Sequence, residues 1–211
     1  MTILRLFTMI LILTFSGSVL AQRWVQFASV EDGFRMMAPG DFEIEDVDFE
    51  TEYGIIVPAH IYRHENDIGK YTMTVVDYRD SQSLHNKRIE ELDGVYIGVY
   101  GEVDVRGSIA FAAKKVRDRA NSIEYDAYHY ISRVDGHQLQ TTNPDRSRTF
   151  AAIYLRESRL YVSEATVKEG ETPPGMFQQS LEFIDEDGGQ IRYRSFREVN
   201  KILGATEGPA I

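Results

Sequence analysis

Residues 71–78 read Tyr-Thr-Met-Thr-Val-Val-Asp-Tyr, and this stretch decides the fold class that we expect. Its β-branched and aromatic side chains suit a pleated, half-buried surface, so it predicts a β-strand. Upstream of it, residues 24–27 and 34–38 carry apolar side chains on either side of Glu31-Asp32-Gly33. A turn flanked by two such segments predicts a β-hairpin.

Two more extended segments are expected between the hairpin and residues 71–78. Residues 55–62 read as a strand, and we expect it at a sheet edge or a bulge because Pro58 has no amide hydrogen. The segment before it is an acidic strip that could collect Ca²⁺, a cation that takes roughly six to eight oxygens. Alternation along a strand spreads these carboxylates over two faces, which favours a solvated strand face instead. The strip consists of Asp41, Glu43, Glu45, Asp46, Asp48, Glu50 and Glu52.

The hydrophobic period changes to that of a helix in the middle of the chain. Val105, Ile109, Ala112 and Val116 recur at spacings of four, three and four residues. This pattern predicts a helix over residues 105–120. Residues 84–99 also show helical spacing, but they contain two glycines, each of which costs about 1 kcal/mol relative to alanine in a helix.

A period of two returns after residue 123 and predicts a β-meander. The expected strands are 125–133, 148–155 and 160–167, with turns at 135–136, 143–144 and 157–158. Pro173-Pro174-Gly175 then predicts the start of a short helix over residues 176–183. Its apolar face would hold Phe177, Leu181 and Ile184.

The first residues of the chain have the pattern of a secretory signal. Arg5 is their only charge, an apolar run follows it, and small residues end at Ala21. The run is shorter than the roughly 20 residues of a spanning helix, so we expect cleavage, with no integral membrane span left afterwards. The chain is therefore expected in the periplasm or outside the cell. The expected organisation is a signal peptide at 1–21, one α+β domain over 22–184, and a tail over 185–211 that is partly basic.

The composition excludes several classes of function. The chain of 211 residues has no cysteine, which excludes a disulfide scaffold, a cysteine nucleophile and a thiolate zinc site. Its 33 acidic and 23 basic residues give a formal charge of −10, and loss of Arg5 with the signal would make it −11. Such a charge disfavours nucleic acid and anionic membranes as partners.

The motifs that carry chemistry are missing from the sequence. It has no Gly-x-Ser-x-Gly elbow, phosphate-binding loop or dinucleotide fingerprint, so no cofactor is expected. His60 and His64 have the spacing of a helical metal pair, but on a strand they lie about 13 Å apart at 3.3 Å per residue. Ser108 suits a helix cap. We assign no catalytic residue and no metal ligand.

Several short motifs occur together along the chain. They are Trp24-x-x-Phe27, Gly33-Phe34, Pro39, the strand 71–78, Val134-Asp135-Gly136, Arg159-Leu160-Tyr161 and Phe177-x-x-Ser180-Leu181. Taken together, these segments resemble the PsbP-like family of exported or lumenal α/β domains. That resemblance implies an α+β fold, with an antiparallel sheet flanked by helices in an α/β/α sandwich, and roles in assembly or accessory binding. It implies no common set of catalytic residues.

The leading hypothesis from the sequence is an exported, non-catalytic domain that binds a protein partner of the envelope as an assembly or accessory factor. One alternative is a carrier of a small molecule or lipid, with a cleft between sheet and helix. Another is a hydrolase whose carboxylates meet only in the fold. Candidate partner-binding residues are the tyrosines Tyr128 and Tyr130, with a large apolar face and a polar tip, and the basic residues Arg192, Arg194 and Arg197 of the tail.

Overall fold

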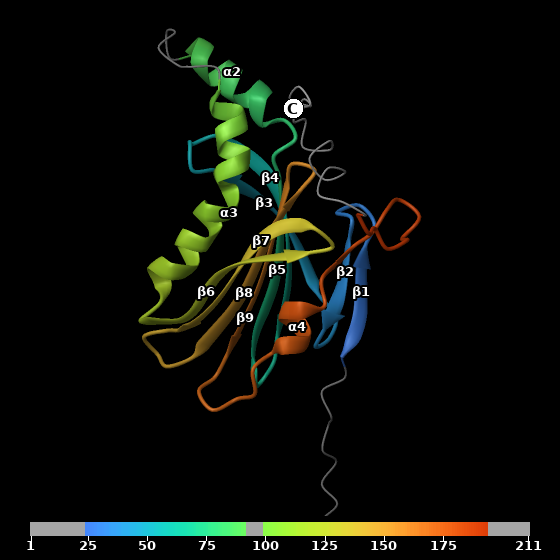
Figure 1. The fold of residues 1–211 in the computed structure, drawn as a ribbon, viewed down its shortest axis with the longest axis vertical. Coiled ribbons are helices and arrows are strands. Elements are labelled where there is room, and N and C mark those ends of the chain that lie inside the picture. Colours follow the sequence, from blue (N-terminus) through green and yellow to red (C-terminus); the bar gives the residue numbers. More distant parts are fainter. Residues whose placement is uncertain (1–23, 92–98, 194–211) are drawn as a thin grey trace, which may run out of the picture.

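The computed structural model describes residues 24–91 and 99–193, and Figure 1 shows its layers. No described helix is both long and apolar enough to cross a membrane. The helices are α2 (Ser81–Glu91), α3 (Tyr100–Arg119) and α4 (Gly175–Gln179). The strands are β1 (Val25–Ser29), β2 (Phe34–Ala38), β3 (Glu43–Glu50), β4 (Ile56–Glu65), β5 (Gly69–Asp77), β6 (Ser122–Ile131), β7 (Val134–Thr142), β8 (Arg148–Arg156), β9 (Arg159–Val167) and β10 (Glu182–Phe183).

A seven-stranded antiparallel sheet forms the centre of the molecule, in the order β3-β4-β5-β9-β8-β7-β6. The strand expected at residues 71–78 is confirmed as β5, inside the sheet between β4 and β9. The strands expected at 148–155 and 160–167 are confirmed as β8 and β9. All residues of β8 after the first are buried, so the sheet has to be covered on both faces.

The long helix α3 covers one face of this sheet (Figure 1). Its small apolar side chains, Ala112, Ala113 and Val116, pack in one core with Leu139 and Ile153 of the sheet. The helix expected over 105–120 is confirmed, and it begins earlier, at Tyr100. The helix considered over 84–99 is present as α2 up to Glu91, and residues 92–98 lie outside the described residues.

The other face is covered mainly by a second, three-stranded sheet, β1-β2-β10, together with the short helix α4. The hairpin expected at the start of the domain is confirmed as β1 and β2. Aromatic side chains fill the core between the layers, among them Phe34, Tyr62, Tyr71 and Phe177. The antiparallel α+β class is therefore confirmed, but the α/β/α sandwich is wrong in one layer, because a small sheet lies where a helical layer was expected.

The helix expected over 176–183 is correct only in its first half. α4 ends at Gln179, and the chain then becomes extended and pairs with β2, where the Arg35 guanidinium lies 2.5 Å from the Glu182 carboxylate. Leu181 and Phe183 are buried at a spacing of two residues. Phe177 and Leu181 are four residues apart, as on one face of a helix. Phe177 lies in α4, but Leu181 lies beyond the end of that helix, next to β10.

Pro58 does not place its strand at a sheet edge, so that expectation is wrong. β4 lies between β3 and β5, and Pro58 pairs with Asp48 of β3. The ladder between β4 and β5 begins at Ala59, one residue further on. At Pro58 the strand therefore has a neighbour on one side only, and a missing amide hydrogen is tolerated there.

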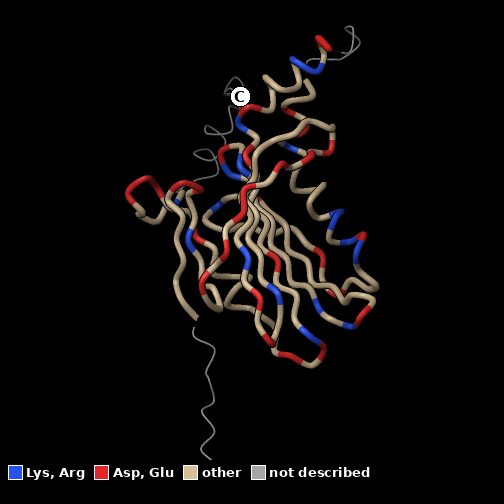
Figure 2. Tube along the Cα trace, turned by 180° about the vertical axis from the view of Figure 1, so that it is seen from behind, with Lys and Arg blue, Asp and Glu red and all other residues tan. Residues whose placement is uncertain are grey.

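Charged side chains of both signs are interspersed over the described residues, as Figure 2 shows. Most cationic residues of α3 are paired with neighbouring carboxylates, whereas Lys115 lies over the rings of Phe49 and Phe111. Lys114 binds Asp118, Arg117 binds Asp126, and Arg119 binds Glu164. These pairs compensate much of the positive charge on this helix.

The turn expected at residues 135–136 is wrong, because both residues lie inside β7. The chain turns instead at Ser132 and Arg133, which have positive φ values of 48° and 68°. Gly136 is needed inside the strand for another reason. A Cβ atom there would lie 2.2 Å from the Ile153 carbonyl oxygen and 2.3 Å from the Tyr154 ring.

Replacing Gly136 with alanine should therefore lower the free energy of unfolding by about 1–3 kcal/mol, the usual cost of overpacking a core. Gly175 is a matched control, since a Cβ there meets nothing within 4 Å. Urea unfolding of Gly136→Ala and Gly175→Ala measures both effects. Equal stability of the two variants would contradict the close approach described at Gly136.

Candidate functional site

The strand register gathers a set of polar side chains at one end of the large sheet. His60 of β4 pairs with Val75 of β5, which pairs with Tyr161 of β9. Directly paired residues share one face of a sheet, so His60 and Tyr161 point to the same side. Asp77 and Arg159 are paired on that side, two residues further along β5 and β9.

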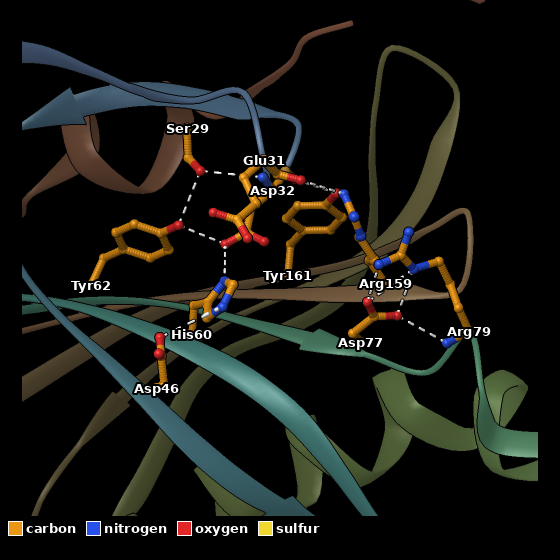
Figure 3. Close-up of polar contacts among 10 residues, drawn as sticks. All are labelled: Ser29, Glu31, Asp32, Asp46, His60, Tyr62, Asp77, Arg79, Arg159 and Tyr161. Carbon is orange, nitrogen blue, oxygen red and sulfur yellow. Dashed lines mark hydrogen bonds and ion pairs between the residues drawn. The ribbon is translucent and has the colours of Figure 1, made fainter. Parts of the chain in front are cut away.

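The turn between β1 and β2 covers this end of the sheet and brings Asp32 onto it (Figure 3). Asp32 is only 4% exposed. Its carboxylate oxygen Oδ2 accepts hydrogen bonds from Tyr62 Oη at 2.6 Å and His60 Nδ1 at 2.8 Å. The Tyr161 hydroxyl donates to the Asp32 backbone carbonyl at 2.8 Å. These residues, with Ser29, form what we call the Asp32 cluster.

The Asp32 cluster shifts the protonation of its members. Burial alone would lower the pKa of His60, but the hydrogen bond to Asp32 and the charges of Asp32, Glu31 and Asp46 raise it above its ordinary value. Burial and the hydrogen bond to Asp32 also raise the pKa of the Tyr62 hydroxyl. The cluster therefore joins a buried carboxylate to an imidazole and a phenol whose pKa values are both raised.

A second pair of polar groups borders the cluster. The Arg79 guanidinium binds the Asp77 carboxylate, with Nε 2.9 Å from each oxygen. Burial alone would raise the pKa of Asp77, but the hydrogen bonds from Arg79 and the charge of Arg159 lower it. Arg159 donates to the Glu31 carbonyl at 2.9 Å and so ties the turn to β9. A hollow of about 220 Å³ lies between these groups and His60.

The geometry of the Asp32 cluster suits an anchor better than a catalytic centre. A histidine oriented by an aspartate can activate a hydroxyl nucleophile when that hydroxyl lies within hydrogen-bond reach. Among the described residues, the hydrogen-bond and ion-pair partners of the His60 ring nitrogens are the carboxylates of Asp32 and Asp46, and no hydroxyl is bonded to them. The cluster holds the β1–β2 turn on the sheet.

Another buried histidine lies between α2 and α3. His85 Nε2 is 2.9 Å from Asp104 Oδ2, and the Thr51 hydroxyl donates to the same oxygen at 2.5 Å. Within residues 24–91 and 99–193, Asp32 and Asp104 are the carboxylates that are fully buried. They belong to separate clusters, so they do not form the close carboxylate pair that the hydrolase alternative requires.

A cleft of about 550 Å³ opens where the helices meet the end of the sheet. Its floor is apolar and includes Tyr78, Val105 and Leu155, and Arg79 and Arg106 lie at its rim. This is the arrangement of sheet, helix and cleft that the carrier alternative requires.

The tyrosines singled out in the sequence lie together on the edge strand β6. Tyr128 and Tyr130 are 60% and 54% exposed, and their ring centroids are 6.2 Å apart. Tyr128 Oη donates to Asp135 at 2.7 Å. Their proposed role in binding a partner stays a prediction.

The tail is described only at its beginning. Ile191 bonds back to the Phe183 carbonyl, and the Tyr193 hydroxyl accepts a hydrogen bond from Arg156 at 2.9 Å. Arg192 is exposed and donates to Gln190. Arg194 and Arg197 lie outside the described residues, and no described contact joins Arg192 to the tyrosines of β6.

The histidines of β4 have separate partners. His64 Nδ1 lies 2.9 Å from the Asp41 carbonyl, whereas His60 binds Asp32. Within the described parts of the chain, no three His, Asp or Glu side chains are grouped as a metal ion would require. Five residues of the acidic strip lie on β3, with their carboxylates exposed along the sheet edge, and Asp41 and Glu52 lie just outside the strand.

Sequence reasoning missed the Asp32 cluster. It interpreted Asp32 as part of a turn, and Tyr62 and Tyr161 as strand residues. Tyr62 and Tyr161 lie 30 and 129 residues from Asp32 along the chain, and only the packing of the hairpin on the sheet brings them together. The alternation of His60 and Tyr62 on one strand was the single local signal.

The comparisons with known proteins are sparse. No family model matches the chain, and no curated protein matches it. Among solved structures, the chain is similar to the solution structure of cyanobacterial PsbP (CyanoP) from Synechocystis sp. PCC 6803. The TM-score is 0.45 with 9% sequence identity, over 79% of this chain and 96% of that chain. The likeness is one of general architecture alone, and we transfer no residue role from that protein.

Replacing His60 with glutamine should destabilise the protein, and the loss should depend on pH. Because the folded-state pKa of His60 is raised, its contribution is fully present below pH 6.5 and is lost as the pH rises through the folded-state value. We expect a loss of about 2 kcal/mol at pH 6 that shrinks toward pH 8, as for a hydrogen bond to a charged group.

His64→Gln is the matched control, on the same strand but outside the cluster. Urea unfolding of both variants at pH 6, 7 and 8 measures the effect. A His60→Gln loss that is the same at all three pH values would show that the imidazolium charge does not hold the turn.

Proposed function

We propose that this chain is an exported periplasmic accessory domain that binds a protein partner and has no catalytic chemistry of its own. The observation that carries the proposal is the contrast between the two edges of the large sheet. An edge strand presents main-chain groups that a second polypeptide can pair with, and proteins usually protect such edges with charge, bulges or cover.

The β3 edge is protected in this way. Five of its eight residues are acidic, and all five are exposed. A second strand that approached this edge would meet a row of carboxylates. The charge of β3 therefore blocks strand addition at this edge.

The β6 edge is different. Its exposed large side chains are Ile123, Tyr125, Tyr128 and Tyr130. Tyrosine is enriched at protein interfaces because it contributes a large apolar face and a polar tip at a small cost in conformational entropy. A bulge interrupts the strand between Ile123 and Tyr125, and the remainder of β6 keeps regular pairing. This edge is suited to contact with another protein.

Two further observations support the proposal. The pattern of residues 1–21 supports export. His60 and the buried His85 support a non-catalytic role, because the described polar partners of both rings are carboxylates. Both histidines take part in contacts that hold elements of the fold together.

A photo-reactive phenylalanine analogue at position 128, introduced in cells that export the chain, tests this proposal. We expect a covalent adduct with a polypeptide, because the side chain at 128 would lie in the interface. The same analogue at Ile44, which is 58% exposed on β3, is the matched control. Adducts that form equally at both positions, or at neither, would contradict a binding edge at β6.

The cleft beside α3 favours a second candidate, a small-molecule carrier. If the chain carries a ligand there, the native mass spectrum of the exported protein should show an added small mass. Val105→Trp, which fills the cleft floor, should abolish that mass, and Tyr128→Lys should leave it unchanged. An unliganded spectrum for the unmodified chain would remove this candidate.

A further inference from the structure

We propose that the polypeptide bound at the β6 edge is a second copy of this chain, paired antiparallel to β6 about a two-fold axis at Tyr128. The inference rests on the proposed function, since it names the partner of the same edge. It follows from the register of the β6–β7 hairpin, from the chemistry of the outward residues, and from the charges along the strand.

The register decides which main-chain groups of β6 point away from the sheet. Ser132 and Arg133 form a two-residue turn in which both φ angles are positive, and Ile131 pairs with Val134 across it. In such a hairpin the pair that closes the turn shares both hydrogen bonds, and bonded pairs then recur at every second residue. His129 and Ala127 therefore bond toward β7. The main-chain groups of Asp126, Tyr128 and Tyr130 are directed outward.

These outward residues are complementary to themselves. When two copies of β6 run antiparallel with Tyr128 opposite Tyr128, Asp126 of each copy lies opposite Tyr130 of the other. Every outward-directed residue then meets an outward-directed residue, as an antiparallel hydrogen-bonded ladder requires. An interface of this kind uses the same patch on both copies, which is the commonest symmetry of protein oligomers.

The side chains of the same residues favour this pairing. Asp126 and Tyr128 pair with Leu139 and His137 of β7, so their side chains share one face with that of Tyr130. The pairing places four tyrosine rings side by side on that face, two from each copy. It also brings Tyr130 to the Asp126 carboxylate of the other copy, a contact of the same kind as the Tyr128–Asp135 hydrogen bond within the chain.

The charges along β6 do not oppose the pairing. Asp126 is already compensated by Arg117, at 2.6 Å, and by His137. These contacts, the Arg117 hydrogen bond above all, lower the pKa of Asp126 to about 2. It would face a tyrosine and not another carboxylate. The same operation on β3 would oppose acidic side chains to one another.

The rest of the fold leaves room for a second strand. α3 packs mainly against β7, β8 and β9, and the side chains of Tyr125, Tyr128 and Tyr130 on β6 stay 42%, 60% and 54% exposed. Because each copy carries a formal charge of −10, association should strengthen with salt, which screens the repulsion between the copies.

Single cysteines test the register, since the chain has none of its own. Directly opposite residues in a hydrogen-bonded pair have Cα atoms about 5.5 Å apart, within the range that a disulfide spans. Tyr128→Cys in the full exported chain should therefore form a disulfide-linked dimer under mild oxidation. Its rate should be at least about tenfold higher than that of the control Ile44→Cys, which corresponds to about 1.4 kcal/mol. Asp126→Cys and Tyr130→Cys should each cross-link slowly alone and rapidly when mixed.

Opposite charges at the symmetry axis give a second, non-covalent test. Tyr128→Lys and Tyr128→Glu should each sediment as monomers, because like charges would meet at the axis, and their mixture should recover a one-to-one dimer. Position 128 is exposed, so neither substitution disturbs the core. The unmodified chain should show more dimer at 0.5 M salt than at 0.05 M, as screening requires.

The outcomes separate the inference from the proposed function. A chain that stays monomeric at both salt concentrations, with no preference for cross-linking at position 128, overturns the self-pairing. A photo-adduct at position 128 with a different polypeptide would then retain the proposed function. If position 128 forms no adduct with any polypeptide, the proposed function fails as well.

Discussion

The double-sided burial of β8 and β9 is the constraint on which the rest of the structure depends. Ile153 and Leu155 of β8 face the core under α3, whereas Ala152 and Tyr154 face the opposite core. A sheet that is apolar on both faces needs a second layer on each face. In this chain one face is packed against a helix and the other mainly against a small sheet. Small alanine side chains let α3 lie close to one face, and aromatic residues fill the thicker core beneath the small sheet on the other.

The second cover explains the Asp32 cluster. A three-stranded sheet with a two-residue third strand contributes little stability by itself, so it has to be attached to the large sheet. Asp32 provides this attachment at the turn, because a buried carboxylate needs partners and finds them in His60 and Tyr62 of β4. The concentration of polar groups at this end of the sheet is thus a consequence of how the layers are joined.

The two edges of the large sheet have opposite chemistry because they meet different requirements. The β3 edge carries exposed carboxylates, which discourage a further strand. The β6 edge carries tyrosines whose main-chain groups are directed outward. This contrast is the basis for proposing that a partner binds at the β6 edge and not at the β3 edge.

The sequence by itself determined the elements whose signal is local. The period of residues 105–120, the β-branched stretch at 71–78 and the turn residues of the first hairpin were sufficient for a helix, a strand and a hairpin, and supported an antiparallel α+β class. β7 was missed because its residues are largely polar and because Asp135-Gly136 is a typical turn sequence. Glycine is required at position 136 for another reason, since the Tyr154 ring of β8 leaves no room for a Cβ atom. Tyr128 and Tyr130 were singled out from their alternation, and their role in binding stays a prediction.

Tertiary structure alone decided which residues meet and which edges remain open. The Asp32 cluster joins positions that are distant along the chain, and no local pattern encodes the docking of one sheet on another. Local sequence also did not predict that a small sheet takes the place of a helical layer. The apolar residues at 181–184 fit the spacing of a helix and that of a strand equally well. This segment forms the strand β10 because its main chain pairs with β2 and the Glu182 carboxylate binds the Arg35 guanidinium.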